Sequence, residues 1–363
     1  MVAVFTTSDI VKDIYLKSPW KEILQDLKNV FVDTDMYIPL DEEDPTFILD
    51  FAEVDFDSSK SDFIKSLVEK PANVLEEPCG IYLLNISEEQ ANRIQSEYGV
   101  ICLSDKNLDH FLLTHLGTSA ELKKGEKSEK WKNWTDILRK FQSTPTNSVL
   151  VIDAHLFEND YFDERQNPPA YDSQRNIGIT NLYNILNQIL PNAFSDEGYH
   201  VGVLLTDIDV AKDNKRSRTN LTNSRIATAI NKLKNKLKRL YPIHIEIIFI
   251  PHTDRDAHQL IHNRRIITNS YILEVPYKLA AFNKNNKSTY SQPITVKPLF
   301  SLIHLGNDSD TKATRLQYDL NELSQYIINQ CNPKLKHKGV LFQNGLLSDS
   351  FTTVQHRFLK PSI

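Results

Sequence analysis

Three apolar runs, separated by helical patterns, limit the possible folds of this chain more than any other feature. The runs cover residues 149–152, 201–205 and 245–250, the last of which contains one charged residue, Glu246. Apolar runs without polar alternation are typical of strands that are buried on both faces, as in parallel sheets. Between the runs, apolar residues recur every three or four positions, which predicts helices over about 177–190 and 226–240. Residues 148–250 therefore predict crossover units in which helices cover a sheet.

The first part of the chain shows a smaller alternation of the same kind. Short apolar runs predict strands at 30–32, 46–49, 81–84 and 100–103. Ser87, followed by acidic residues, indicates the start of a helix. At 363 residues the chain is long enough for two domains. A turn-rich segment at 143–147 predicts the boundary, with a small α/β domain at 1–142 and a mixed-sheet α/β/α domain at 143–363.

The net charge of -5 is unevenly distributed along the chain. Residues 1–140 hold 16 Lys and Arg against 27 Asp and Glu, whereas the remainder holds 26 against 20. The C-terminal part is therefore the basic one. This asymmetry fits an anionic ligand on the second domain, and equally an attraction between the two domains.

Several classes of protein are disfavoured by the sequence. The longest apolar runs are too short to cross a bilayer, and the N-terminus lacks the basic start and apolar core of a signal peptide. Cys79, Cys102 and Cys331 suggest neither a disulfide framework nor a thiolate metal cluster. With only 10 glycines, no glycine-rich phosphate loop is evident. We expect a cytoplasmic protein without a membrane span, a cofactor or a bound metal.

Polar residues gather directly after the third long apolar run, between residues 251 and 269. Open α/β sheets bind ligands where their parallel strands end. The centre of this segment is His262-x-Arg264-x4-Asn269, which is followed by an apolar extended stretch. The segment is the first candidate for a functional site.

This pattern resembles a degenerate form of the H-x-K-x4-D motif of the phospholipase D superfamily, which includes nucleases as well as lipases. The resemblance covers the strand and helix order over roughly residues 148–275. More narrowly, residues 262–269 are similar to the corresponding segment of catalytically degenerate phospholipase-D-like domains, such as those at the C-terminus of MIT-domain proteins. No MIT helix bundle is evident in this chain.

The resemblance implies a role for each residue of the motif. A histidine attacks phosphorus, a basic side chain neutralises phosphate oxygens, and a carboxylate orients the imidazole. His262 would be the nucleophile, and Arg264, with Arg265, would hold the phosphate through a bidentate fork. Asn269 in place of the carboxylate cannot stabilise an imidazolium by charge, so catalysis should be weak.

An active site of this family needs two such motifs, and the chain contains one. A homodimer would supply the second, and His155 is another possible partner for His262. Three interpretations stay open: a degenerate binding site, an active nuclease or phosphodiesterase, and surface residues without a site.

The sequence disfavours two possible metal sites. His258 and His262, with Asp254 and Asp256, lack the glutamate of a zinc-protease pattern, which favours a solvated loop. Aspartates recur after apolar runs, as a Mg²⁺ site would require: Asp33, Asp35, Asp153, Asp207 and Asp209. Aspartate is also common as a helix N-cap after parallel strands, and we favour that interpretation.

A basic loop follows the second long apolar run and contains Lys212, Lys215, Arg216 and Arg218. It suits contacts to a phosphate backbone rather than base reading, and Lys232, Lys234, Lys236, Lys238 and Arg239 would extend it. Trp131, Trp134 and Phe141 have helical spacing and are interpreted as core residues.

The expected function is phosphodiester binding, with nucleic acid as the expected ligand and little or no catalysis. One alternative is an active nuclease, acting through a dimeric His262 site or through Mg²⁺ on the aspartates. The other is an interaction scaffold whose acidic N-terminal domain binds a protein partner.

Overall fold

The computed structural model describes a defined subset of the chain, and every structural statement below concerns those residues. They are 4–7, 9–10, 36–37, 56–57, 60–104, 106, 120–122, 133–138, 144–154, 156, 177–206, 223–250, 261, 264–275, 279, 294–298, 322–325, 341–343, 346–347 and 355–359.

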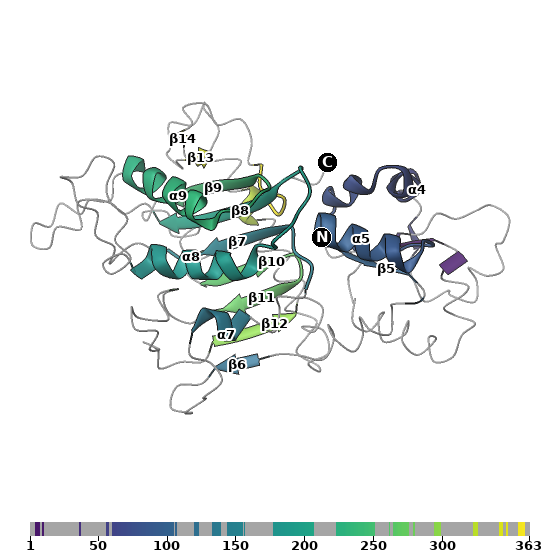
Figure 1. The fold of residues 1–363 in the computed structure, drawn as a ribbon, viewed down its shortest axis with the longest axis horizontal. Coiled ribbons are helices and arrows are strands. Elements are labelled where there is room, and N and C mark those ends of the chain that lie inside the picture. The colour runs from purple at the N-terminus through teal and green to yellow at the C-terminus, as the bar shows by residue number, and fades with distance from the viewer. Residues whose placement is uncertain are drawn as a thin grey trace, which may run out of the picture.

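The protein belongs to the α/β class and contains two separate sheets (Figure 1). The first sheet has the strand order β3-β2-β1-β4-β5, and every pair in it is parallel. Its strands are β1 (Val4–Thr6), β2 (Met36–Tyr37), β3 (Phe56–Asp57), β4 (Ile81–Leu83) and β5 (Ile101–Leu103). The expected strands at 30–32 and 46–49 lie outside the described residues.

Helices α4 (Ser61–Glu69) and α5 (Glu88–Tyr98), with a 3-10 turn at Pro71–Leu75, pack on one face of the first sheet. The helix start predicted at Ser87 is confirmed. The Ser87 hydroxyl accepts a hydrogen bond from the Gln90 N–H, and the Gln90 side chain accepts one from the Ser87 N–H. This reciprocal cap satisfies two amide groups that a helix leaves unpaired at its N-terminus. At the other end α5 stops at Gly99, which has φ +61°.

The second sheet is mixed and has the order β14-β13-β9-β8-β7-β10-β11-β12-β6. The three long apolar runs form its parallel centre, as predicted. The flanking strands are antiparallel to their neighbours. The strands are β6 (Ala120–Leu122), β7 (Ser148–Ile152), β8 (Tyr199–Thr206), β9 (Ile243–Ile250), β10 (Arg265–Thr268), β11 (Tyr271–Glu274), β12 (Ile294–Pro298), β13 (Leu341–Gln343) and β14 (Leu346–Leu347).

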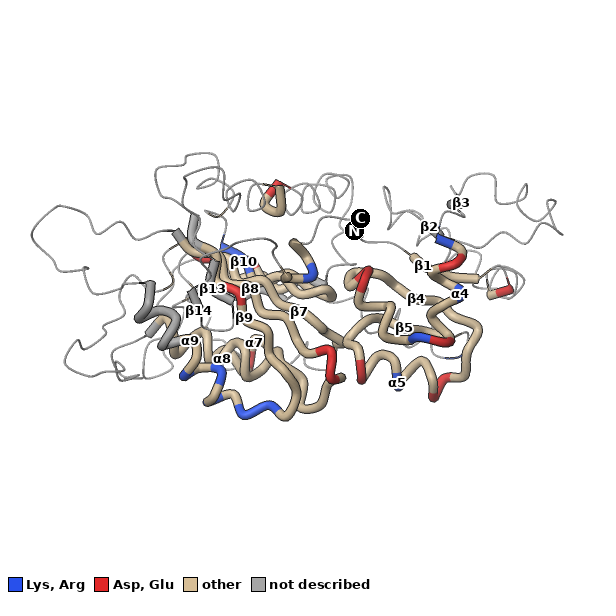
Figure 2. Tube along the Cα trace, turned by 90° about the horizontal axis from the view of Figure 1, so that it is seen from above, with Lys and Arg blue, Asp and Glu red and all other residues tan. Residues whose placement is uncertain are grey.

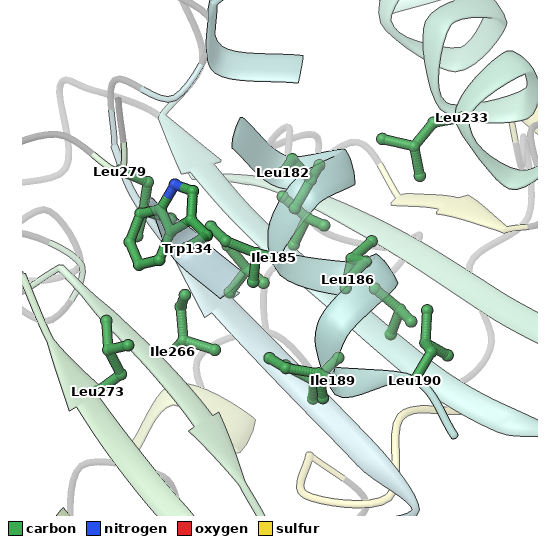
Figure 3. Close-up of a cluster of buried hydrophobic side chains, with 14 of the residues drawn as sticks. Trp134, Leu182, Ile185, Leu186, Ile189, Leu190, Leu233, Ile266, Leu273 and Leu279 are labelled. Atoms are coloured by element: carbon green, nitrogen blue, oxygen red, sulfur yellow. The ribbon is translucent and has the colours of Figure 1, made fainter. Parts of the chain in front are cut away.

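Helices α7 (Trp134–Leu138), α8 (Ile177–Ile189) and α9 (Asn223–Leu237) cover one face of this sheet (Figure 1). Their apolar side chains meet those of the strands in one buried cluster, part of which Figure 3 shows. Trp134 is 1% exposed, and its indole N–H donates to the Asn181 side chain of α8 at 2.5 Å. The interpretation of Trp134 as a core residue is thereby confirmed.

Two elements that precede residue 143 in the sequence pack with the second sheet, and the domain boundary expected at 142/143 stays a prediction. Strand β6 pairs with β12, and Trp134, Ile137 and Leu138 of α7 pack into the core of the second sheet. The sequence predicts an exposed linker at residues 143–147, because turn-forming residues are common in exposed loops. Thr146 and Asn147 are instead buried.

None of the described helices is long and apolar enough to cross a membrane.

Candidate anion-binding site

Arg264 lies where the parallel strand β7 ends. Strand β10 runs antiparallel to β7 with Arg265 opposite Ile152, which brings the preceding residue, Arg264, next to Asp153. The Nε of Arg264 lies 3.4 Å from Oδ1 of Asp153, whose side chain is fully buried, while the Arg264 side chain is 12% exposed. Of the polar segment predicted at residues 251–269, Arg264 is therefore placed at the carboxyl edge of the sheet, beside Asp153.

Asp153 is held in place from several sides. Its backbone N–H donates to the Leu204 carbonyl of the adjacent strand β8 at 3.1 Å. Its Oδ2 accepts a hydrogen bond from the Leu279 N–H at 2.7 Å. A carboxylate fixed in this way restricts the position of the guanidinium beside it, because a buried charge pair is stable only in good geometry. Asp153 therefore orients Arg264.

This pair supplies the chemistry of an anion site. A guanidinium carries five N–H donors in a planar fork, so it can hold a carboxylate along one edge and a second anion along another. The same geometry disfavours Asp153 as a Mg²⁺ ligand, because both of its oxygens already face protein donors.

Arg265 occupies a different environment from Arg264. It is 8% exposed and lies within β10. Successive side chains of a strand point to opposite faces, and the neighbouring Ile266 belongs to the core under the helices. Arg265 therefore lies on the other face of the sheet.

Asn269 is at the opposite edge of the sheet from Arg264. Residues 264 and 269 lie on either side of β10, and five residues of extended chain span about 17 Å. The Asn269 oxygen accepts a hydrogen bond from the Asn147 N–H at 2.9 Å, and its nitrogen donates to the Gly99 carbonyl at 2.7 Å. Asn147 directly precedes β7, whereas Asp153 follows its end. The amide of Asn269 thus links the backbone of Gly99 to that of Asn147 at the amino edge of the sheet. This geometry gives no support to its expected role of orienting His262.

The other expected site residues, His262, Lys212, Lys215, Arg216 and Arg218, lie outside the described residues, and so do His155, His258 and the remaining aspartates of the Mg²⁺ alternative. Within the described part of the chain, no group of three or more His, Cys, Asp or Glu side chains could hold a metal ion.

The described cysteines are poor nucleophiles. Cys79 and Cys102 are free thiols. Burial raises the pKa of the Cys102 thiol to about 12, and burial also raises the pKa of Cys79. Both thiols are therefore protonated at neutral pH, and the thiolate is the reactive form of cysteine.

A second buried polar cluster was not anticipated from the sequence. Both carboxylate oxygens of Glu246 in β9 accept backbone N–H groups, from Gln355 and from His356, at 2.8 Å. Arg357 donates to the carbonyls of Asn147 and Gly198 at 2.7 and 2.9 Å. The signal available in the sequence was Glu246, a charged residue within the apolar run 245–250. A carboxylate in a buried strand requires hydrogen-bond partners, so its presence predicts a polar cluster around it.

In comparisons with known proteins, no family model, no curated protein and no solved structure matches the chain.

Proposed function

We propose that this protein binds phosphodiesters at the carboxyl edge of its second sheet, with Arg264 as the residue that holds the phosphate and nucleic acid as the ligand. The observation that carries the proposal is the Arg264–Asp153 pair: an arginine side chain that is 12% exposed, beside a fully buried carboxylate, at the end of a parallel strand. Binding crevices of open α/β sheets occur at such edges. Arginine is also the side chain best suited to bidentate phosphate contacts.

His262 stands two residues before Arg264 in the chain and is proposed as a hydrogen-bond donor to the same phosphate or as a residual nucleophile. The basic loop of Lys212, Lys215, Arg216 and Arg218 remains part of the proposal from sequence, whereas Arg265 is left out of it because its side chain is buried on the other face of the sheet. Because Asn269 is engaged elsewhere, weak or absent catalysis is the expected behaviour of this site.

The test is a binding titration with a labelled 20-nucleotide strand over a series of salt concentrations. Arg264→Lys keeps the charge beside Asp153 but loses the planar fork, so the fold should persist while affinity falls by about five- to tenfold, as expected for one charge-assisted hydrogen bond. Arg93→Lys is the matched control, because Arg93 is 72% exposed on α5 and pairs with Glu97. Equal affinity of Arg264→Lys and wild type would refute the proposal.

The same samples separate binding from cleavage. Cleavage that persists in EDTA and is lost in His262→Ala would indicate the nuclease with a dimeric histidine site. Cleavage that is abolished by EDTA would indicate the nuclease that acts through Mg²⁺ bound by the aspartates. Salt-dependent binding without cleavage is the result that we expect.

A further inference from the structure

The first sheet contains a topological switch point, which the proposed function does not use. Its order β3-β2-β1-β4-β5 places β1 at the centre, and all of its strand pairs are parallel. From the carboxyl end of β1 the chain continues to β2 on one side, whereas from β4 it continues through α5 to β5 on the other side. Open α/β sheets bind ligands outside the strand ends at the point where the connections diverge in this way.

Two buried hydroxyl groups lie at this point, those of Thr6 and Thr7. Thr6 is the last residue of β1, is fully buried and pairs with Leu83 of β4, and Thr7 follows it directly. Among the described residues, neither the Thr6 Oγ1 nor the Thr7 Oγ1 has a hydrogen-bond partner, although both atoms are buried. A buried hydroxyl that lacks a partner has lost its hydrogen bonds to water without replacement, which opposes folding.

Thr268 of the second sheet shows how a buried threonine hydroxyl is used for structure. This residue is also fully buried. Its Oγ1 accepts hydrogen bonds from the N–H groups of Ser270 and Tyr271 at 3.2 and 3.0 Å, and donates to the Tyr271 carbonyl at 3.3 Å. Buried polar groups are paired in this way in most proteins, so an exception calls for a partner outside the chain.

Packing gives no reason for a hydroxyl at residue 6. Phe5 packs into the buried cluster that α4 and α5 share with the first sheet. Because successive side chains of a strand point to opposite faces, Thr6 points away from these helices. At its level of the sheet, β4 and β5 carry Leu83 and Leu103, which are both buried. A valine would therefore suit the packing at residue 6 as well as threonine does.

The charges near the switch point disfavour an anionic ligand. Asp9, Glu88 and Glu89 are exposed after β1 and β4, against Lys106 after β5. Figure 2 shows acidic residues in red at both ends of α5. The N-terminal end of this helix, where an anion would bind, is already closed by its reciprocal side-chain cap. An uncharged ligand fits this edge of the sheet better than a phosphate.

The sequence after β1 also disfavours a dinucleotide. Sheets that bind dinucleotides carry a glycine-rich turn after the first strand, because the pyrophosphate closely approaches the backbone there. In this chain Thr7, Ser8 and Asp9 follow β1, and the first glycine of the sequence is Gly80. Side-chain hydroxyl groups, rather than a bare backbone, are the groups that this turn offers to a ligand.

We propose that the first sheet binds an uncharged sugar at its switch point, either a free pentose or the ribose of a nucleoside, through the hydroxyl groups of Thr6 and Thr7. A threonine hydroxyl is both donor and acceptor, so it can pair with a sugar hydroxyl in either direction. This site is independent of Arg264, because it lies on the other sheet. A water molecule is the competing partner for a buried hydroxyl.

The experiment titrates the full chain with adenosine, D-ribose and adenosine monophosphate, and measures the melting temperature and the dissociation constant. The test variants are Thr6→Val and Thr7→Val, which each replace one hydroxyl by a methyl group of similar size. Thr268→Val is the matched control, because it removes a buried hydroxyl that is paired within the protein.

We expect adenosine to raise the melting temperature of wild type, since a ligand that binds only the folded state stabilises it. An equal affinity for D-ribose would identify the pentose as sufficient. Thr6→Val and Thr7→Val should each bind adenosine about fivefold more weakly, as expected for one hydrogen bond, and adenosine monophosphate should bind wild type more weakly than adenosine.

The melting temperatures without ligand test the hydroxyl groups themselves. Thr6→Val should melt at or above the wild-type temperature, because no described residue pairs with this hydroxyl. Thr268→Val should melt at a lower temperature and bind adenosine like wild type. If Thr6→Val lowered the melting temperature as much as Thr268→Val, the protein itself would pair the hydroxyl, and the inference would be overturned.

Three results of the titrations would also overturn the inference. The first is unchanged affinity for adenosine in both Thr6→Val and Thr7→Val. The second is tighter binding of adenosine monophosphate than of adenosine. The third is that neither adenosine nor D-ribose raises the melting temperature at millimolar concentration, which would leave water as the partner of the two hydroxyl groups. The oligonucleotide titration of Arg264→Lys is unaffected by each of these results, so the proposed function is tested separately.

Discussion

At the scale of single residues, the side-chain amide of Asn269 forms hydrogen bonds to both parts of the molecule, one to the end of α5 beside the first sheet and one to the backbone before β7 of the second. Its nitrogen donates to the carbonyl of Gly99, which ends α5 of the first sheet, and its oxygen accepts from Asn147 at the start of β7. The contact is tight, because a Cβ on Gly99 would lie 2.0 Å from the Thr146 carbonyl oxygen. Both functions of the amide, donor and acceptor, are used.

Asn269→Asp is therefore expected to destabilise the protein, although aspartate is the residue found at this place in the H-x-K-x4-D motif. A carboxylate has no N–H for the Gly99 carbonyl and would bring a charge into a buried site. We expect a loss of about 1–3 kcal/mol in the free energy of unfolding and no gain of catalytic activity.

Urea unfolding with a parallel cleavage assay measures both effects. Asn92→Asp on the exposed side of α5 is the control and should have unchanged stability. A stable Asn269→Asp variant with new metal-independent cleavage would contradict this account of the residue.

At the scale of elements, Arg239 connects the ends of two helices. It donates to carbonyls at the end of α8 and to the Leu237 carbonyl of α9 at 2.8 Å. The last four carbonyls of a helix lack partners within the helix, and a cation there also favours the helix dipole. Arg239 therefore contributes to the relative position of α8 and α9, together with the apolar cluster that the two helices share.

We expect Arg239→Gln to lower the free energy of unfolding by about 2 kcal/mol, since several charge-assisted hydrogen bonds are lost together. Lys238→Gln removes the same charge one residue earlier and should change stability by less than about 0.5 kcal/mol. Thermal melting followed by circular dichroism compares the two. Equal melting temperatures for both variants would show that the bonds of Arg239 contribute nothing.

Over the whole molecule, the segment 355–359 ties distant parts of the second sheet together. The ring of His356 is fully buried, with Nε2 3.0 Å from the Val149 carbonyl oxygen of β7. Arg357 reaches the backbone before β7 and β8, and the Ser324 hydroxyl donates to the Leu359 carbonyl at 2.7 Å. Gly202 of β8 leaves room for the histidine, because a Cβ there would lie 2.9 Å from the ring.

This segment predicts a pH dependence of stability. Burial lowers the pKa of His356 to about 3, although the hydrogen bond to Val149 acts in the opposite direction. The unfolded chain binds the proton near pH 6.5, and the folded protein binds it only near pH 3. The contribution of His356 is therefore complete above pH 6.5 and is lost as the pH falls, with a slope of up to about 1.4 kcal/mol per pH unit.

His356→Gln should keep a donor for Val149 and remove this titration. Urea unfolding between pH 7 and 4 then gives the free energy of unfolding as a function of pH. We expect this free energy to fall less steeply in His356→Gln than in wild type, because the variant takes up close to one proton fewer on unfolding. If the free energy of unfolding depended on pH equally in the two proteins, the unfolding of wild type would not involve proton uptake by His356.

The sequence alone was sufficient for the features that depend on neighbours along the chain. The parallel centre of the second sheet, helices α8 and α9 and the cap at Ser87 all follow from periodicity or from a few adjacent residues. These patterns report local geometry and the burial of one side of an element.

Only the tertiary structure decided which residues Asn269, Asp153 and the segment 355–359 contact. Asn269 and Gly99 are 170 positions apart, and Arg357 and Asn147 are 210 apart. The same holds for β6 and α7, which follow the first sheet in sequence but complete the second. A buried polar group must find a partner wherever the fold brings one, and no local pattern specifies a partner at that distance.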